Sequence, residues 1–506
     1  MHWQARNNNQ VTKVGLMEQH LSSGGISPNK LCIGGRWIEA SGEVHHPVFN
    51  PATGQKFSLV SEAGHADIDS AVQAAHNALE DRAWAAMLPN SRAALLWDIA
   101  AIIDEHADEL ALLETRDQGQ PLRIARNMSV RGAAEHFRYF AGWTTKLDGT
   151  VPSVSRQDAM LYTQRVPVGV CGLITPWNFP LLIAAWKLAP ALATGNTAIL
   201  KPSEFTSQST IRLVELMQQA GLPAGVVNLV TGGGAVGAYM GEHPGINKIS
   251  FTGSTAVGRS LIGAAQGNLK RLSLELGGKA ASVVCQDADL EKSVPKNIAN
   301  VVNNSGQVCG ALSRFYVHES RYDEFVEKVA QGLDEVVVGS GEDETTTMGP
   351  LTSQPHLSKV EALVQEALET GAQAATGGQR MTGDLGAGYF YPPTLLTNVS
   401  DEQGVAREEI FGPVMPVMTY SDEDDVVRRV NDSEYGLSAS VWTENLARGH
   451  NLASKISAGA VRVNTVSGLD PAAPWGGMRA SGWGREMGPD ALDAYTEVKA
   501  TWIGLE

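Results

Sequence analysis

The sequence has few cysteines, and they follow no motif. Only four occur in 506 residues, and no two of them have Cys-x-x-Cys spacing. A zinc knuckle or a dithiol redox motif requires that spacing, so both are excluded and we expect no bound metal. So low a thiol content is typical of a reducing compartment rather than of a disulfide-stapled secreted protein. The four are Cys32, Cys171, Cys285 and Cys309.

The chain also lacks an excess of positive charge and a long hydrophobic run. Its formal net charge is −16, which argues against a nucleic-acid partner because a phosphate backbone demands a basic surface. Residues 1–20 contain no apolar stretch of the kind found in signal peptides. The most apolar segment, 180–195, is interrupted by Lys187 and Pro190 and is too short to span a bilayer. We therefore expect a cytoplasmic protein with no membrane partner.

The composition is otherwise that of an ordinary globular protein, with 43% hydrophobic and 19% charged residues. A prior of roughly 150 residues per domain suggests about three units. From residue 166 onward, five short apolar segments alternate with helical patterns, which requires a parallel sheet with helices on its faces. Right-handed crossovers make this a doubly wound, Rossmann-like α/β unit. Strands are expected at 166–174, 197–200, 226–230, 246–251 and 272–276, and helices at 65–80, 91–117, 181–193, 209–219, 236–241 and 256–265.

A second alternating set follows the glycine-rich joint at 276–278, where we place a domain boundary. Glu275 then lies on one side of the boundary and Cys309 on the other. Because ligand clefts often form between domains, chemistry is expected at this interface. The strands of the second set are expected at 281–285 and 314–318, and its helices at 290–303 and 321–336.

Cys309, in Asn-Asn-Ser-Gly-Gln-Val-Cys-Gly, is the candidate nucleophile. Its setting is a polar glycine loop, whereas Cys171 and Cys285 lie in apolar strands and are expected to be inert. The helix before Cys309 is expected to end near Gly306, where a glycine allows a sharp turn. Glu275, in Leu-Glu-Leu-Gly-Gly-Lys, can activate water. A thiol and such a base can together form and hydrolyse a thioester.

Asn178, in Thr-Pro-Trp-Asn-Phe-Pro, offers an amide that can hold a developing oxyanion, although alone it could equally be a turn former. Together the three motifs resemble the aldehyde dehydrogenase superfamily, over nearly the whole chain. The resemblance implies that family's α/β fold and a homo-oligomer. The base at Glu275 favours the hydrolytic type over the type that transfers the acyl group to coenzyme A, with Lys187 and Glu486 as a proton relay. The implied domains are 1–144 and 166–277 for NAD binding, 278–478 for catalysis, and 145–165 with 479–506 as a small β oligomerisation arm.

Two glycine loops compete for the pyrophosphate of the cofactor. The loop at 232–237 matches Gly-x-Gly-x-x-Gly after a strand, but no acidic residue follows about 20 positions later. The loop at 253–258 begins a helix whose free N–H groups could bind phosphate, and the resemblance favours it. A carboxylate at Glu204 would repel a 2′-phosphate, so we expect NAD rather than NADP. The residues expected to bind the cofactor are Ile174, Trp177, Lys201, Ser203, Glu204, Gly237, Gly253, Ser254, Gly277, Glu409 and Phe411.

The resemblance also implies an apolar, aromatic substrate tunnel, with no cation to receive a substrate carboxylate. We therefore expect an aromatic, terpenoid or medium-chain aldehyde and disfavour short semialdehydes. The aromatic rings could instead face a trimethylammonium group, as in a betaine-type aldehyde, or they could simply pack the domain core. The expected lining consists of Phe179, Ile183, Trp186, Asn303, Val308, Leu469 and Trp475.

Two other functional classes are compatible with some of these residues. A cofactor-independent esterase could use Cys309 and Glu275, but it would leave the segments 201–204 and 251–258 without a purpose. A catalytically silent structural relative would be expected to have lost the nucleophile, and Cys309 is present.

Overall fold

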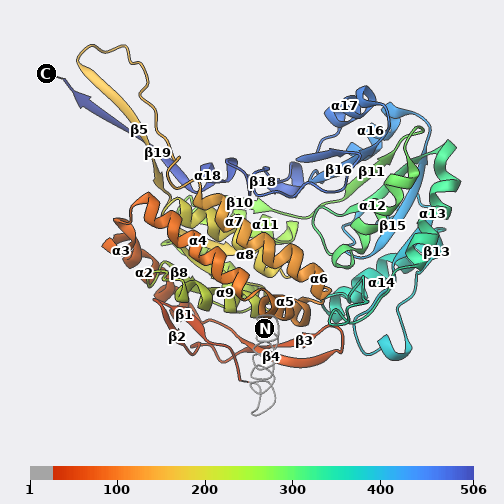
Figure 1. Ribbon diagram of the computed structural model, residues 1–506, viewed down its shortest axis with the longest axis horizontal. Coiled ribbons are helices and arrows are strands. Elements are labelled where there is room, and N and C mark those ends of the chain that lie inside the picture. The colour runs from red at the N-terminus through yellow and green to blue at the C-terminus, as the bar shows by residue number, and fades with distance from the viewer. Residues whose placement is uncertain (1–26, 506) are drawn as a thin grey trace, which may run out of the picture.

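The structure is a computed structural model that describes residues 27–505. The expectation that residues 1–20 contain no signal peptide therefore lies outside the described residues. The chain forms two α/β lobes side by side, and a thin two-stranded arm projects from the first of them (Figure 1). None of the helices in the described part is both long and apolar enough to cross a bilayer.

The first lobe is built on an eight-stranded sheet with the order β18-β10-β9-β6-β7-β8-β1-β2. Its five central strands pair in parallel, as the alternating pattern predicts. The expected strand at 166–174 is in fact two strands, because Gly169 has a φ of +122° and turns the chain between them. The central strands are β6 (Val170–Ile174), β7 (Thr197–Lys201), β8 (Val227–Leu229), β9 (Lys248–Thr252) and β10 (Arg271–Glu275); the antiparallel flanks are β1 (Leu31–Ile33), β2 (Arg36–Ile38) and β18 (Gly482–Trp483).

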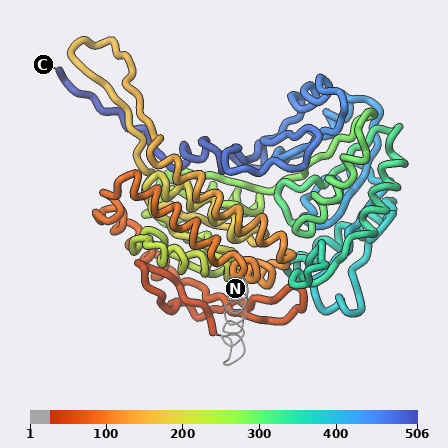
Figure 2. The backbone as a smooth tube through the Cα atoms, viewed as in Figure 1, coloured from red at the N-terminus to blue at the C-terminus, as the bar shows by residue number. Residues whose placement is uncertain are grey.

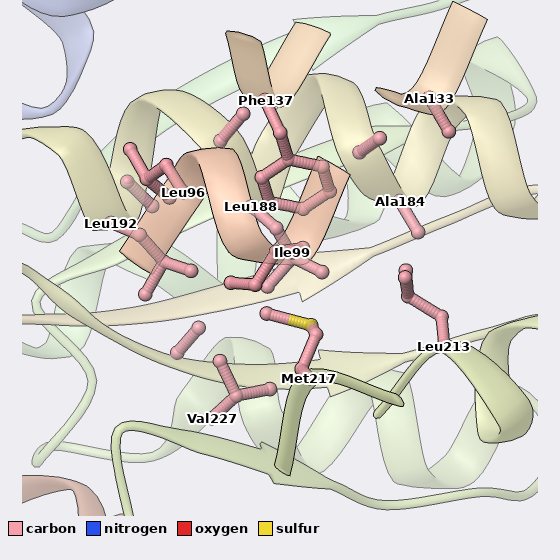
Figure 3. Packing of buried hydrophobic residues seen from close by; sticks show 14 of the residues in the cluster. Leu96, Ile99, Ala133, Phe137, Ala184, Leu188, Leu192, Leu213, Met217 and Val227 are labelled. Atoms are coloured by element: carbon pink, nitrogen blue, oxygen red, sulfur yellow. The ribbon is translucent and has the colours of Figure 1, made fainter. Parts of the chain in front are cut away.

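Helices cover this sheet and bury its largest hydrophobic core. Phe137, Leu188 and Ile99, from three different helices, pack together on one face of the sheet, and Met217 of a fourth helix joins the same cluster (Figure 3). Helix α8 (Pro180–Ala193) is buried along its whole length, which explains why its sequence is apolar on every side. The expected helix at 91–117 is two helices that meet at His106. The helices are α2 (His65–Glu80), α4 (Pro89–Glu105), α5 (Ala107–Gln118), α7 (Arg131–Ala141), α9 (Gln208–Gln219), α10 (Gly234–Glu242) and α11 (Thr255–Ala264).

The second lobe contains a seven-stranded sheet with the order β13-β14-β15-β12-β11-β16-β17. All of its neighbouring strands are parallel except the β13–β14 pair at one edge. A hairpin of the first lobe, β3 (His45–Asn50) with β4 (Gln55–Ser61), reaches it, since the Tyr389 N–H donates to the Pro51 carbonyl at 2.8 Å. The elements are β11 (Ala280–Val284), α12 (Leu290–Val302), β12 (Leu312–His318), α13 (Tyr322–Asp334), α14 (Gln354–Glu369), β13 (Gln373–Thr376), β14 (Thr394–Thr397), β15 (Val414–Tyr420), α16 (Glu423–Asn431), β16 (Ser438–Trp442), α17 (Leu446–Lys455) and β17 (Ala460–Val463).

The chain enters the second lobe after β10 and returns from it near the C-terminus (Figure 2). The arm is a ribbon of β5 (Ala159–Pro167) and β19 (Thr496–Gly504), which pair along nine positions. The segment 479–495, which the sequence assigned to the arm, instead lies against the first lobe: β18 pairs with β10, and α18 (Asp490–Ala494) contacts α8.

Candidate active site

The order of the parallel strands marks a crevice in the first lobe. After β6 the chain moves to β7 and β8 on one side, and it then returns to β9 and β10 on the other side. Ligands of such sheets bind beyond the carboxyl ends of the strands at this point of reversal. The segments that leave β6 and β9 there carry Trp177 and Asn178 on one side and Gly253 and Ser254 on the other.

A cavity of about 170 Å³ lies at this crevice, between the two lobes. It contains the candidate nucleophile, base and oxyanion donor, although they come from widely separated positions in the chain. Glu275 is the last residue of β10, and Cys309 lies just before β12 in the other lobe. The cavity brings together nine predicted residues: Trp177, Asn178, Gly253, Ser254, Glu275, Gly277, Cys309, Glu409 and Phe411.

The turn that presents Cys309 differs from the expected one. Helix α12 ends at Val302, four residues before Gly306. Asn304, Ser305 and Gly306 then adopt left-handed backbone conformations in succession, with φ of 49°, 54° and 73°. A Cβ on Gly306 would lie 2.2 Å from the Gly412 carbonyl oxygen, so only glycine fits there. The nucleophile is thus placed by a three-residue left-handed turn rather than by a helix end.

Asn178 is held in place by the loop that carries Cys309. Its Nδ2 donates to the Gln307 carbonyl at 2.9 Å. The backbone carbonyl of Asn178 accepts from Asn304 Nδ2 at 2.8 Å and from Gln120 Nε2 at 3.1 Å. The first bond orients the side-chain amide and the other two hold the backbone of the same residue, so the donor is positioned before any substrate is present, as an oxyanion donor needs. Asn304 belongs to the motif of Cys309 but was given no role from the sequence, and Gln120 belongs to no motif, so sequence reasoning did not find these contacts.

The site disfavours the charged forms of both Cys309 and Glu275. Burial, together with the nearby Glu275 carboxyl, raises the pKa of the Cys309 thiol to about 12. Burial also raises the pKa of Glu275 well above its usual range, and the neighbouring Glu486 adds to this effect. Both Glu275 carboxyl oxygens are buried and have no hydrogen-bond partner in the described part of the chain. A carboxyl without a protein partner is free to exchange a proton with a thiol or a water molecule.

Lys187 and Glu486 form a buried ion pair behind Glu275. Ser250 Oγ joins the pair, because it accepts from Lys187 Nζ at 2.9 Å and donates to Glu486 Oε1 at 2.8 Å. The second oxygen of Glu486 is buried and has no hydrogen-bond partner among residues 27–505. Both residues of the expected relay are therefore adjacent, and both act electrostatically on Glu275.

The remaining predicted cofactor residues lie around the carboxyl ends of β6 and β7, outside this cavity. Lys201 Nζ is buried 3.8 Å from Glu204 Oε2, and Ser203 lies between them in the chain. A Cβ on Gly237 would reach only ordinary contact with Ile174 and with Lys201, at 3.8 and 3.9 Å. The five residues that remain, which are Ile174, Lys201, Ser203, Glu204 and Gly237, therefore lie close together.

The two glycine loops differ in which N–H groups are available. In the loop at 232–237, the Gly233 N–H already donates to Glu62 Oε2 at 3.1 Å. In the rival loop, Ser254 lies at the N-cap of α11 and its Oγ accepts from the Val257 N–H at 3.3 Å. Ser254 also lines the cavity, so the rival loop faces the chemistry and the first loop does not.

Three aromatic rings that contact one another line one wall of the cavity. The ring of Trp177 lies 5.1 Å from that of His356 and 5.2 Å from that of Phe411. Burial lowers the pKa of His356 to about 4, so the ring is neutral and donates from Nε2 to the Phe411 carbonyl at 2.7 Å. Lys359 Nζ donates to the Glu409 carbonyl at 2.8 Å. Sequence reasoning missed His356 and Lys359, which share one helix face but belong to no recognisable motif.

Most of the expected substrate lining forms one apolar cluster next to Cys309. Leu469 is not part of it: its side chain is 43% exposed, on the loop that follows β17. Asn303 reaches the cluster through Met128, with 3.9 Å between Nδ2 and Sδ. The cluster contains the predicted Phe179, Ile183, Trp186, Val308 and Trp475, and also Leu182, Leu437, Met487, Met128 and Ala460, which were not predicted.

The expectation that no cation reaches this lining is wrong. The guanidinium carbon of Arg462 lies 5.5 Å from the centre of the Trp475 ring. Arg462 is in β17 and is separated from the tryptophan by a loop, so neither spacing nor composition pointed to the contact.

The family model described as "Aldehyde dehydrogenase family" matches residues 37–501. A mitochondrial aldehyde dehydrogenase of Leishmania tarentolae is 44% identical over 93% of this chain and 94% of its own length. A phenylacetaldehyde dehydrogenase of Pseudomonas fluorescens is 41% identical over 94% of this chain and 96% of its own. An NAD⁺ complex of an aldehyde dehydrogenase from Bacillus cereus superposes with a TM-score of 0.92 at 41% identity, covering 95% of this chain and 97% of the other.

Proposed function

The chain belongs to the aldehyde dehydrogenase family of enzymes, and we propose that it oxidises an aldehyde to the carboxylic acid through a thioester on Cys309. The observation that carries the proposal is the single cavity lined by Cys309, Asn178 and Glu275. A nucleophile, an oxyanion donor and a base within one buried cavity meet the requirements of acyl chemistry with hydrolysis.

The residues present fit a bound NAD. The N-terminus of α11 and Ser254 would hold the pyrophosphate, since free N–H groups and the helix dipole favour an anion there. A Cβ on Gly277 would lie 2.5 Å from Glu409 Oε2, so this glycine leaves the Glu409 carboxyl accessible. When bound, NAD supplies the acceptor for the hydride of the substrate. The Glu204 carboxylate would repel a 2′-phosphate, which favours NAD over NADP.

The protein residues then account for the chemistry at the carbonyl carbon. The Cys309 thiol gives its proton to water, and Sγ bonds to the carbon, giving a thiohemiacetal whose oxyanion is bound by Asn178 Nδ2 and the Cys309 N–H. Loss of hydride from that carbon leaves a thioester. Glu275 next removes a proton from water, the hydroxide oxygen bonds to the same carbon, and the carbon–sulfur bond breaks to release the acid. Lys187 and Glu486 can pass the proton on from Glu275.

We infer that the substrate has an apolar or aromatic body, because the cluster beside Cys309 is made of such side chains. The name of the phenylacetaldehyde dehydrogenase relative agrees with this class. A trimethylammonium aldehyde is disfavoured by the charge of Arg462 next to Trp475.

We also propose that the β5–β19 ribbon joins copies of this chain in a homo-oligomer. The ribbon projects away from both lobes (Figure 1) and exposes large apolar side chains, among them Val498 and Trp502, which is 55% exposed. Exposed apolar surface of this kind commonly marks an interface.

The test is a panel of aldehydes with NAD and with NADP, followed by the absorbance of the reduced cofactor. We expect NAD-dependent oxidation that Cys309→Ala abolishes while NAD binding, measured by calorimetry, persists. Ester cleavage without any aldehyde oxidation would instead identify an esterase. Oxidation at the normal rate by Cys309→Ala would exclude the thiol as the nucleophile.

A further inference from the structure

We propose that Arg462 recognises an anionic group on the substrate, so that the preferred aldehyde carries a carboxylate at the end remote from its carbonyl. This inference rests on the proposed function and deepens it. It assigns a specificity-determining role to a residue outside the catalytic motifs.

The alternation of strand β17 directs Arg462 toward the active site. Val461 packs with the core of the second lobe, and Val463 lies against α17 at Gly449. Because successive side chains of a strand point to opposite faces, Ala460 and Arg462 share the other face. Ala460 packs against the apolar cluster that contains Cys309. The arginine therefore extends from the wall of the substrate region.

The indole of Trp475 connects the guanidinium to the reacting centre. A Cβ on Gly310, the residue after Cys309, would lie 2.7 Å from Trp475 Cη2. The guanidinium carbon of Arg462 is 5.5 Å from the centre of the same ring. Cys309 and Arg462 are also near enough that the charge of a Cys309 thiolate would act on the pKa of the arginine. A substrate bound to Cys309 that runs along the indole would end at the guanidinium.

The guanidinium has donors to offer. Arg462 Nε and Nη1 are buried and have no hydrogen-bond partner, and no ion pair forms with Arg462 anywhere in the described part of the chain. Burial of an unpaired cation is costly, and such groups are normally paired. Gly468 lies against this side chain, since a Cβ there would be 2.9 Å from Nε.

A second buried arginine of the same lobe shows the usual arrangement. Arg314 donates from Nε to the Lys279 carbonyl at 3.1 Å, from Nη1 to the Arg429 carbonyl at 3.4 Å and from Nη2 to the Val430 carbonyl at 3.0 Å. The fold thus satisfies a structural guanidinium with its own carbonyls. The unpaired donors of Arg462 are left for a group that arrives with the substrate, and a carboxylate is the group they bind best.

The experiment compares aldehydes that differ only in the anionic group. The pairs are benzaldehyde with 4-carboxybenzaldehyde, and hexanal with 6-oxohexanoate, each oxidised by the complete enzyme with NAD. We expect kcat/KM to favour the carboxylate member by on the order of 10- to 100-fold, the range of a hydrogen bond to a charged group. Arg462→Gln should abolish this preference by raising the KM of the carboxylate member. Arg462→Lys should keep part of it, and Arg428→Gln, at an exposed arginine of α16, should change nothing.

The outcomes separate the two proposals. If no aldehyde is oxidised, the proposed function is wrong. If neutral aldehydes are oxidised, but wild type shows no carboxylate preference or Arg462→Gln retains it, only the role of Arg462 is overturned. If Arg462→Gln misfolds and oxidises neither member of a pair, Arg462→Lys is the deciding variant. A carboxylate preference that this variant keeps would support the proposal. A preference that it loses while it still oxidises the neutral aldehyde would refute the proposal.

Discussion

Glu275→Gln separates the two halves of the proposed reaction. Gln has nearly the shape of Glu, and the Glu275 side chain is only 4% exposed with no protein hydrogen bond to lose. A general base contributes about 10²–10⁴ in rate, equivalent to about 3–5 kcal/mol of transition-state free energy. That base is needed in every turnover to hydrolyse the thioester. We therefore expect a burst of reduced cofactor close to one per active site. The steady-state turnover that follows should be slower than in wild type by about 10²–10⁴.

The same substitution has a predictable effect on stability. Because burial raises the pKa of Glu275, the folded state disfavours the ionised carboxyl. The resulting penalty is absent below the pKa of the unfolded chain and grows as the pH rises toward the folded pKa, by about 1.4 kcal/mol per unit of difference. Gln carries no such penalty. The variant should unfold at the same temperature as wild type in acid and at an equal or higher temperature near neutral pH.

The assays are stopped-flow absorbance for the burst and thermal unfolding across a pH series. In wild type, turnover limited by hydrolysis should rise with pH through a midpoint above the ordinary carboxyl range, and Glu275→Gln should lack this rise. Equal loss of burst and turnover in a variant as stable as wild type would refute the assignment of Glu275 as the base of hydrolysis. A burst that vanishes together with stability would indicate damaged packing, which the structure does not predict.

Four further substitutions test other parts of the structure. Asn178→Ala should lower the rate of the burst by about 10²–10³, the usual effect of losing one oxyanion donor; an unchanged burst would exclude that role. Glu204→Gln should raise kcat/KM with NADP relative to NAD by roughly 10-fold, because a like charge facing the 2′-phosphate is removed; an unchanged ratio would contradict the cofactor assignment. Gly277→Ala should raise KM for NAD, since its Cβ would lie 2.5 Å from Glu409 Oε2, and calorimetry with NAD alone would show whether binding is the step affected. Phe137→Ala should lower the free energy of unfolding by about 3–5 kcal/mol, because the ring is fully buried, and chemical denaturation would measure the loss.

The sequence predicted those features whose cause is local. Strands such as β7 and β9 are short buried segments that alternate with helical patterns, so the parallel sheet followed from that alternation. The split of 166–174 at Gly169 was missed, since nothing in composition shows that a glycine takes a positive φ. The left-handed turn that follows α12 was missed for a similar reason, because Asn304 and Ser305 adopt a conformation that residues other than glycine rarely take.

Long-range contacts could not be read from the sequence. His356 and Lys359 reach the cavity because α14 of the second lobe packs near Glu409, and no spacing in the sequence indicates such a contact. Arg462 was overlooked because only the fold of the intervening loop brings it next to Trp475, and the sequence does not show that fold. Leu469 was included because its position matches the substrate tunnel of the resembled family, whereas its burial depends on how that loop turns.

The antiparallel pairing of β18 with β10 also bears on how the protein is made. Gly482 lies opposite Glu275, and Glu486 follows a few residues later. A chain still emerging from the ribosome would already contain Cys309. It would still lack the segment that pairs with β10 beside Glu275 and that contains Glu486, the ion-pair partner of Lys187. Competence for turnover should therefore appear abruptly, once the segment that contains Gly482 and Glu486 has been synthesised and has docked.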